Sequence, residues 1–329
     1  MPTSALLYLQ SRTPLYQQQH KGSNFGALRR WHLSVSKLQA VPARKLQGIL
    51  VQRHINSCAG SAETQPRITT NQQLSGDVLT PEGSLESLQA AAEVRPILSG
   101  GGGGIFFFWQ LGVIKYLQQH YDLTKVDMVG ASAGALMVTL AVCNVDPDCA
   151  VQRAYDIAKE RDIWGRRFGL AGIWGDLVKQ WLDDLLPSNA VELSQGRLKL
   201  VVTRIPSFEI AYVKDFTSKQ DLINACLASA HVPFFLDGRA TCNYRGKECI
   251  DGSLSDFLTK GNSALLHCEG NAFIVDYYAD TALAFGRFDF LKLRSHDEIM
   301  GLIESGKQFA ERTDKTGGFR KTLGKVALT

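Results

Sequence analysis

The first 62 residues of this chain contain no aspartate and no glutamate. They carry eight basic residues, while the other 28 basic and 32 acidic residues follow them and give a net charge of −4. Because the positive charge is confined to the N-terminus, we expect no nucleic acid as a partner. The stretch also lacks the uninterrupted apolar segment of a secretory signal. Its acid-free, Arg- and Ser-containing composition predicts a transit peptide over 1–62, for plastid or mitochondrion; the alternative is a basic tail that stays attached.

The seven cysteines form no CxxC pair. Their spacing excludes the usual zinc sites, and their odd number argues against a disulfide framework. Cys242 and Cys249 could pair across a hairpin, although the distribution favours buried free thiols. A calcium-loop motif is also missing. We therefore expect no metal and no organic cofactor.

Two long stretches, 96–114 and 128–145, lack charged residues altogether. Each is long enough for a transmembrane helix. However, five glycines interrupt the first stretch, and Ser132 stands between glycines in the second. Buried parallel strands and the helices that follow them produce similar apolar runs. The two stretches therefore favour an α/β protein over a membrane-spanning one.

The pattern predicts a polar linker over 63–94 and one domain over 95–329, in which strands alternate with helices. We expect the linker to end in a short helix. The predicted strands lie at 97–99, 126–129, 198–203, 209–213, 244–250 and 273–277. The predicted helices lie at 106–119, 133–143 and 221–230. Beyond residue 286 the pattern is weaker.

Ser132 stands in the pentapeptide Gly-Ala-Ser-Ala-Gly, between the strand predicted at 126–129 and the helix predicted from 133. This placement is typical of a nucleophile elbow, the sharp turn that exposes a catalytic serine. Gly130 and Gly134 leave room for such a turn, and the helix N-terminus favours negative charge at the serine. The motif alone is common by chance, so its position between these elements indicates Ser132 as a nucleophile.

Five consecutive glycines, Gly100 to Gly104, directly follow the first predicted strand. Glycine backbones can approach an oxyanion closely and present N–H donors to it. A phosphate-binding loop is the competing interpretation, but the chain has no GxxxxGK[ST] motif and no regular GxGxxG spacing. A flexible linker fits badly because apolar residues flank both ends. We therefore interpret the run as an oxyanion loop.

Asp251 follows the strand predicted at 244–250 and precedes Gly252. An aspartate at the end of a strand can reach a catalytic cleft. Asp-Gly is also a common turn dipeptide, so this signal by itself leaves both interpretations open.

Together these three motifs resemble the patatin-like phospholipases. The glycine run precedes the serine motif by about 30 residues, and Asp-Gly follows far downstream. The resemblance covers about residues 97–258. It includes the segments Leu111–Ile114, Asp127–Gly130, Ala228–Phe235 and Ile250–Asp256.

The resemblance implies a three-layer α/β/α fold with a mostly parallel sheet, and a serine–aspartate dyad without histidine. Ser132 would attack an ester carbonyl, and Asp251 would accept its proton. Since one carboxylate must serve both steps, burial should raise its pKa. The backbone N–H groups of Gly102, Gly103 and Gly104 would stabilise the oxyanion, with Gly130, Gly134 and Gly252 as supporting motif residues.

The implied activity is a serine lipid acyl hydrolase of phospholipase A or lipase type that acts on glycerolipids at a peripheral membrane or lipid-droplet surface. Three tryptophans between residues 164 and 181 lie near Arg166 and Arg167, and Phe106–Trp109 is strongly apolar. Aromatic and basic residues together suit a lipid–water interface. The alternative is that these aromatics pack a core helix and a cap.

The chain departs from the family pattern at four positions, two after the glycine run and two after Asp251. Phe106 and Phe107 stand where the family usually has Arg or Lys followed by Gly, so the loop lacks a cation for an oxyanion or headgroup. Ser253 replaces a Gly or Ala, a small change because serine is compact. Phe257 replaces an Asn, which we expect to concern packing.

Two rival interpretations remain open. One is a Ser–His–Asp triad hydrolase, since His267 and His296 follow Asp251 in the order that such enzymes use. Neither histidine lies in a convincing strand-end loop, and we expect His231 to be structural. The other is an inactive lipid-binding protein on the same fold, against which the filled dyad positions argue.

Overall fold

The computed structural model describes residues 94–254, 272–286 and 289–328. The predicted leader over 1–62 lies outside these residues, as does the predicted linker apart from Val94. Phe257 and His267 also lie outside them.

The described strands form one mixed seven-stranded sheet. They are β1 (Ile97–Gly100), β2 (Asp127–Ala131), β3 (Leu198–Ile205), β4 (Glu209–Val213), β5 (Cys242–Tyr244), β6 (Lys247–Asp251) and β7 (Ala272–Val275). The order is β5-β6-β3-β2-β1-β7, and β4 pairs with β3. Only β4 and β6 oppose the direction that the other described strands share. The α/β class and the mostly parallel sheet are therefore confirmed.

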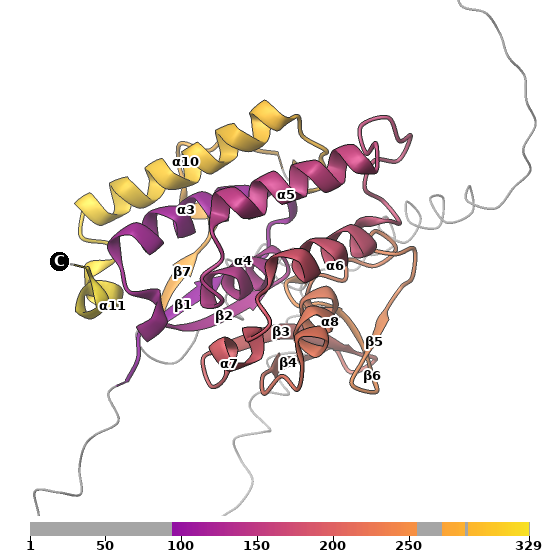
Figure 1. The fold of residues 1–329 in the computed structure, drawn as a ribbon, viewed down its shortest axis with the longest axis horizontal. Helices are drawn as coiled ribbons and strands as arrows, with labels where there is room; N and C mark the ends of the chain where they lie inside the picture. Colours follow the sequence, from indigo (N-terminus) through magenta and orange to yellow (C-terminus); the bar gives the residue numbers. More distant parts are fainter. Residues whose placement is uncertain (1–93, 255–271, 287–288, 329) are drawn as a thin grey trace, which may run out of the picture. The chain divides into compact units, whose positions relative to one another are not determined.

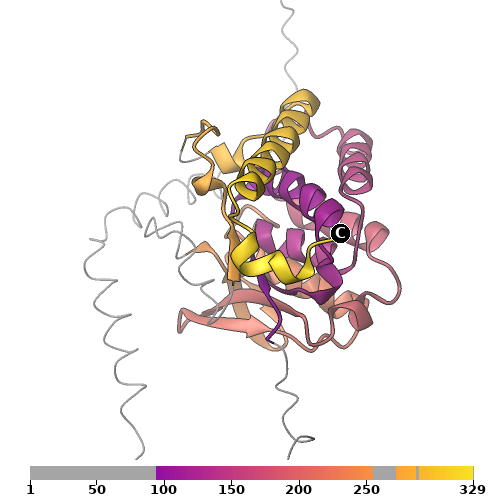
Figure 2. The same ribbon diagram turned by 90° about the vertical axis from the view of Figure 1, so that its left-hand side faces the viewer.

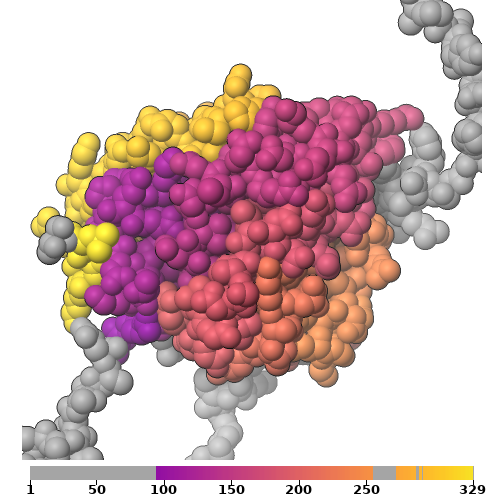
Figure 3. Space-filling view, viewed as in Figure 1, coloured from indigo at the N-terminus to yellow at the C-terminus, as the bar shows by residue number. Residues whose placement is uncertain are grey.

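Helices flank this sheet (Figure 1). They are α3 (Phe107–His120), α4 (Ala133–Val142), α5 (Pro147–Glu160), α6 (Trp174–Leu185), α7 (Ala190–Ser194), α8 (Lys219–Ser229), α10 (His296–Lys315) and α11 (Arg320–Leu323). Helices α4 and α8 pack on the strands, α3 packs on α4, and α10 runs along α3. Most of the coloured helices lie on one side of the strands (Figure 2). In the space-filling view, helices form most of the visible face (Figure 3).

The main core lies between the sheet and these helices. Because side chains of a strand alternate between its two faces, Leu98 and Met128 enter this core while Val129 points to the other face. Val129, Ala131 and Val201 form a separate small cluster there. The carboxyl ends of β1 and β2 therefore carry the glycine run and Ser132 out of a sheet that is buried on both faces.

Five of the described helices were not predicted from the apolar pattern, α5, α6, α7, α10 and α11. Two of them carry clear start signals. Pro147 opens α5 behind Asp146, whose side chain accepts a hydrogen bond from Cys149 N. Ser295 and Glu298 form a capping box at the start of α10. None of the described helices combines the length and the apolar composition needed to cross a membrane.

The strand predicted at 244–250, with a turn at Gly246, is β6, and the turn joins it to β5 in a hairpin. Arg245 and Gly246 both have positive φ, 48° and 72°, which suits the tight turn between two antiparallel strands. Strand β6 begins after this turn and ends at Asp251. Cys242 faces Cys249 across the hairpin, and both thiols are free.

Candidate active site

Ser132 occupies the turn between β2 and α4 in a strained backbone conformation, with φ 55° and ψ −125°. Residues other than glycine rarely adopt a positive φ, and such strain is held only where the surroundings enforce it. A Cβ atom on Gly130 would overlap the carbonyl of Gly134, and one on Gly134 would overlap the carbonyl of Gly100. The two glycines therefore allow β1, β2 and α4 to approach closely enough to make the elbow.

Ser229, at the end of α8, holds this elbow in place. Its hydroxyl accepts a hydrogen bond from Ser132 N (3.1 Å) and donates one to the carbonyl of Val201 on β3 (2.6 Å). Ser229 is fully buried. It therefore ties the nucleophile turn to the neighbouring strand, a role that the sequence analysis missed.

The same segment holds Asp251 at the end of β6. Asp251 N donates to the carbonyl of His231 (2.9 Å), and Gly252 N donates to the carbonyl of Ser229 (3.0 Å). The Thr203 hydroxyl donates to the carbonyl of Asp251 (3.0 Å). The nucleophile and the carboxylate are thus positioned by a single stretch, 229–231.

The carboxylate of Asp251 is buried, with 2% of the residue exposed. Burial raises its pKa, as expected, while the Ser132 hydroxyl and the Ser253 side chain and amide oppose the rise. Oδ1 accepts hydrogen bonds from Ser253 N and Ser253 Oγ, both at 2.8 Å. Oδ2 is buried without a hydrogen-bond partner among the described residues. The Ser132 hydroxyl thus acts on the pKa of this carboxyl, and Oδ2 has no other partner among the described residues.

The glycine run ends β1 beside this pair. An added Cβ on Gly102 would lie 3.5 Å from Ser132 Cβ and would overlap the side chain of Ser253. In the described part of the chain, the backbone N–H groups of Gly102, Gly103 and Gly104 donate no hydrogen bond. Free amides next to a nucleophile are the donors that an oxyanion needs.

The three glycines do not share one environment. Gly102 lies beside Ser132, Gly103 packs against the ring of Tyr277, and Gly104 has φ 52° and packs against the backbone of Phe290. The structure therefore places Gly102 closest to the reacting atoms.

Gln110 on α3 supports the start of the loop. This fully buried side chain donates from Nε2 to the carbonyl of Gly101 (2.7 Å), and Gly101 N donates to the carbonyl of Val275 (3.3 Å). A glutamine at the fourth position of an otherwise apolar helix is the signal in the sequence that could have predicted this support of the loop.

Comparison with known proteins identifies this arrangement. Residues 98–259 match the family model of the patatin-like phospholipases. This part of the chain belongs to the patatin-like phospholipase family.

The curated relatives are similar to less than half of the chain. The human 1-acylglycerol-3-phosphate O-acyltransferase PNPLA3 is 29% identical over 45% of this chain and 32% of its own length. The human omega-hydroxyceramide transacylase is 28% identical over 45% of this chain and 28% of its own. Human patatin-like phospholipase domain-containing protein 4 is 30% identical over 46% of this chain and 61% of its own. The chain thus spans under two thirds of each of these relatives.

One solved structure, VipD from Legionella pneumophila, aligns at 14% identity over 49% of this chain and 46% of that chain. Its TM-score of 0.27 is too low to add to the description of the fold.

The described side chains that depart from the patatin-like pattern form specific contacts in this structure. Phe106 is buried and stacks on Tyr277 at 4.3 Å between ring centroids. Phe107 packs edge-on against Trp181 at 5.4 Å. Ser253, expected to matter only for its small size, donates a hydrogen bond to the Asp251 carboxylate and touches the glycine loop.

His231 touches Asp251 through its backbone, but the rings of His231 and His296 have other partners. The His231 ring is buried, and its Nε2 lies 3.3 Å from the carbonyl of Arg239. Burial lowers the pKa of His231. The ring of His296 packs against Tyr155, with 4.5 Å between centroids. Neither ring contacts Ser132 or Asp251 in the contacts described above.

Proposed function

We propose that this protein is a lipid acyl hydrolase that cleaves ester-linked fatty acids from glycerolipids. Ser132 is the nucleophile, Asp251 is the base, and the glycine run supplies the oxyanion donors. The observation that carries the proposal is the pairing of a strained Ser132 with a buried Asp251 whose Oδ2 lacks a partner.

The reaction proceeds in two acyl transfers. In the first, Asp251 Oδ2 takes the proton of Ser132 Oγ, which attacks the ester carbonyl carbon. The amides near Gly102 bind the resulting oxyanion. The bond to the leaving alcohol then breaks, and the alcohol oxygen takes the proton from Asp251, which leaves an acyl-serine.

In the second transfer, Asp251 takes a proton from water as the water oxygen attacks the acyl carbon. The bond to Ser132 Oγ breaks, Oγ regains a proton from Asp251, and the fatty acid is released. The raised pKa of Asp251 supports this double role, because a carboxylate with a higher pKa is a stronger base.

The test compares the full-length chain with Ser132→Ala and Asp251→Asn on a short-chain nitrophenyl ester and on vesicles of mixed phospholipid and galactolipid. We expect both variants to lose at least about a thousandfold in kcat/KM with unchanged circular dichroism. Ser207→Ala and Asp215→Asn, two exposed positions, are the matched controls. Full activity in either dyad variant would reject the dyad. An inactive wild type whose Ser132 resists a fluorophosphonate probe would instead favour the lipid-binding protein without activity.

A second candidate is transfer of the acyl group to an alcohol rather than to water. Two of the relatives are named as an O-acyltransferase and a transacylase, although the matched part is less than a third of either. The same acyl-serine would serve both reactions. Adding a lysolipid or monoacylglycerol acceptor and analysing products distinguishes them, since transfer yields a new ester in place of free fatty acid.

We also propose that the protein works at a lipid–water interface, on a peripheral membrane or a lipid droplet. In the loop over 161–173, Trp164 and Phe168 are 39% and 44% exposed, and the Arg167 guanidinium stacks on Phe168 at 5.6 Å. Exposed aromatic rings beside arginines are suited to a headgroup region.

The leader over 1–62 remains a proposed transit peptide for plastid or mitochondrion. The support is its composition, eight basic residues and no acidic ones. A fluorescent reporter fused behind residues 1–62 should enter one of these organelles, whereas a diffuse cytosolic signal would reject the idea.

A further inference from the structure

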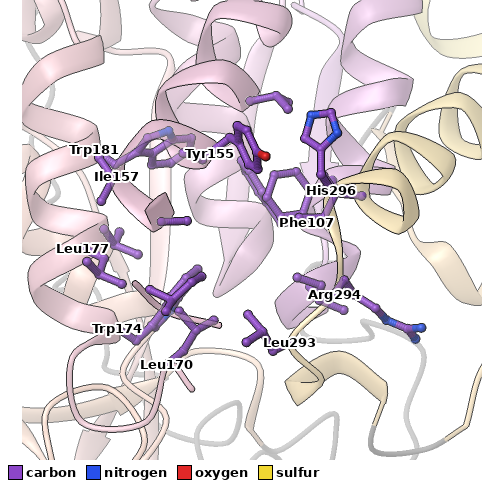
Figure 4. A pocket seen from close by; sticks show the side chains of 18 of the residues that line it. Phe107, Tyr155, Ile157, Leu170, Trp174, Leu177, Trp181, Leu293, Arg294 and His296 are labelled. Atoms are coloured by element: carbon purple, nitrogen blue, oxygen red, sulfur yellow. The ribbon is translucent and has the colours of Figure 1, made fainter. Parts of the chain in front are cut away.

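Gln110 differs in chemistry from the rest of the first half of α3. Every other residue over 107–114 is apolar or aromatic. Phe107 and Phe108 line an apolar pocket that α5 and α6 complete (Figure 4), and Trp109 is fully buried. Gln110 lies outside that pocket, is itself fully buried, and bonds the glycine run. The helix therefore carries one buried amide at the point where it meets the proposed oxyanion loop.

The orientation of the Gln110 amide follows from its partner. The carbonyl of Gly101 can only accept, so the atom that reaches it at 2.7 Å is the donor Nε2. Oε1 is then left buried, without a hydrogen-bond partner among the described residues. A buried acceptor without a partner lowers stability, and an apolar side chain of the same length would avoid this cost. The bond to Gly101 is what the glutamine adds here.

This bond holds a backbone that has wide conformational freedom. Glycine adopts more backbone conformations than any other residue, and five glycines follow one another in this run. Gly101 is bound on both sides, because its N–H donates to the carbonyl of Val275 on β7 (3.3 Å) and its carbonyl accepts from Gln110. The two peptide groups that meet at Gly101 are therefore both held. The amides of the next three glycines, which donate no bond within the described residues, begin directly after this fixed point.

The bond also sets the direction of the Gly102 N–H. The peptide group between Gly101 and Gly102 is trans, so its C=O and its N–H point in opposite directions. The carbonyl bonds α3 and lies 2.6 Å from a Cβ built on Gly134 of α4. The N–H of Gly102 therefore points away from these two contacts. Gly102 is also next to the nucleophile, since a Cβ built on it would lie 3.5 Å from Ser132 Cβ.

We propose that Gln110 is a positioning residue of the oxyanion site. It holds the peptide between Gly101 and Gly102 so that the Gly102 N–H is aimed at the oxyanion of the tetrahedral intermediate. Gln110 touches no reacting atom and acts only through this peptide. Such a donor is most effective when it is oriented before the charge develops, and an unheld glycine peptide would have to reorient in every turnover. The inference rests on the proposed function, because the oxyanion arises in acyl transfer at Ser132.

Gln110→Met tests this role in the full-length chain, since methionine keeps the length of the side chain and removes the donor. With nitrophenyl butyrate, kcat should fall at least about tenfold while KM stays unchanged, because the lost interaction acts on the transition state. Gln118→Met is the matched control. Gln118 lies on the same helix and donates from Nε2 to the carbonyl of Val145 (3.2 Å), away from the glycine run. This control should keep the wild-type kcat.

Gln110→Glu tests the donor itself. The new carboxyl has the shape of the amide but can donate to the Gly101 carbonyl only while it is neutral. Burial should raise its pKa. The ratio of the kcat of this variant to that of wild type at the same pH should therefore be near one in acid and fall at least about tenfold as the pH rises. Circular dichroism at each pH checks that the variant stays folded. A ratio that does not change with pH would contradict the positioning role, and it decides the question alone if Gln110→Met does not fold.

Labelling of Ser132 by a fluorophosphonate gives a readout that needs no ester turnover. Ser132 Oγ attacks the phosphorus, fluoride leaves, and the phosphonyl oxygen gains negative charge during the attack. Labelling should therefore be at least about tenfold slower in Gln110→Met than in wild type or Gln118→Met.

The outcomes separate this inference from the proposed function. If wild type cleaves esters, and both its kcat and its labelling rate are unchanged in Gln110→Met, the positioning role is wrong and the dyad stands. If wild type cleaves no ester but Ser132 is labelled, and Gln110→Met slows the labelling, the positioning role holds and the proposed lipid hydrolysis fails. A wild type that is neither active nor labelled overturns both.

Discussion

Burial and hydrogen bonding act in opposite directions on the pKa of Asp251. Burial raises its pKa, and hydrogen bonds from Ser253 to Oδ1 work against this rise. Because Ser253 stands where the family usually has Gly or Ala, the side-chain bond to the base is a feature of this chain. In the proposed mechanism, this bond adjusts the strength of Asp251 as a base.

We expect Ser253→Ala to raise the pKa of Asp251 further, since it removes the Oγ bond and keeps the backbone one. Only the ionised carboxylate can accept the Ser132 proton. The acidic limb of the pH profile of kcat/KM should therefore move to higher pH, as measured with a soluble ester. Ser207→Ala should leave the limb in place. An unmoved or acid-shifted limb in Ser253→Ala would contradict this role.

Asp251 should also reduce stability at neutral pH. Burial raises its pKa in the folded state above the ordinary value of 3.8, so the folded protein holds this proton more tightly. The contribution of Asp251 to the free energy of unfolding therefore falls as the pH rises from the ordinary pKa through the raised pKa of the folded state. Asp251→Asn should be more stable than wild type above that window by about 1–2 kcal/mol, and the gain should shrink in acid. Urea unfolding at several pH values measures it; a gain independent of pH would argue for another cause.

At the scale of elements, α10 supports the helix that follows the glycine run. A Cβ on Gly306 would overlap the carbonyl of Trp109, and one on Gly112 would overlap the carbonyl of Ile303. The backbones of α3 and α10 therefore touch at these two glycines. This close contact positions α3, whose Gln110 holds the loop carbonyl.

Gly306→Ala should push α10 away from α3 and lower the free energy of unfolding by about 1–3 kcal/mol. Gly301→Ala lies on the same helix with nothing within 4 Å of the added Cβ. There alanine should stabilise by up to about 1 kcal/mol through helix propensity. Thermal unfolding of both variants measures these changes in stability. If both substitutions changed the stability in the same direction, the contact between α3 and α10 would not be tight.

At the scale of the whole molecule, the loop over 161–173 presents two exposed rings, Trp164 and Phe168. In the proposed function, these rings contact the lipid surface.

Phe168→Asp should therefore weaken binding to anionic vesicles at least about tenfold, because burying a phenylalanine is worth about 1.5–3 kcal/mol. Hydrolysis of vesicle lipid should fall in parallel, while a soluble short-chain ester is cleaved as before. Phe208→Asp replaces a ring that is 64% exposed elsewhere and is the control. Equal vesicle binding in Phe168→Asp and wild type would exclude the loop as the docking surface.

The sequence by itself determined the elements around the site and the candidate dyad. The strands before Gly100 and Ser132, and the helices after them, follow from apolar runs and glycine turns, which act over a few residues. The family match supports the same segment. The starts of α5 and α10 could also be predicted from Asp146-Pro147 and from the Ser295 capping box, although these helices are less apolar overall than α3 and α4.

Only the tertiary structure decided how the dyad is held and what adjoins it. Ser229 touches Ser132 across 97 positions of the chain. An apolar pocket forms where α3, α4, α5, α6 and α10 meet. Such contacts depend on which faces pack together, and no local pattern encodes that. The burial that raises the pKa of Asp251 exists only once those faces have met.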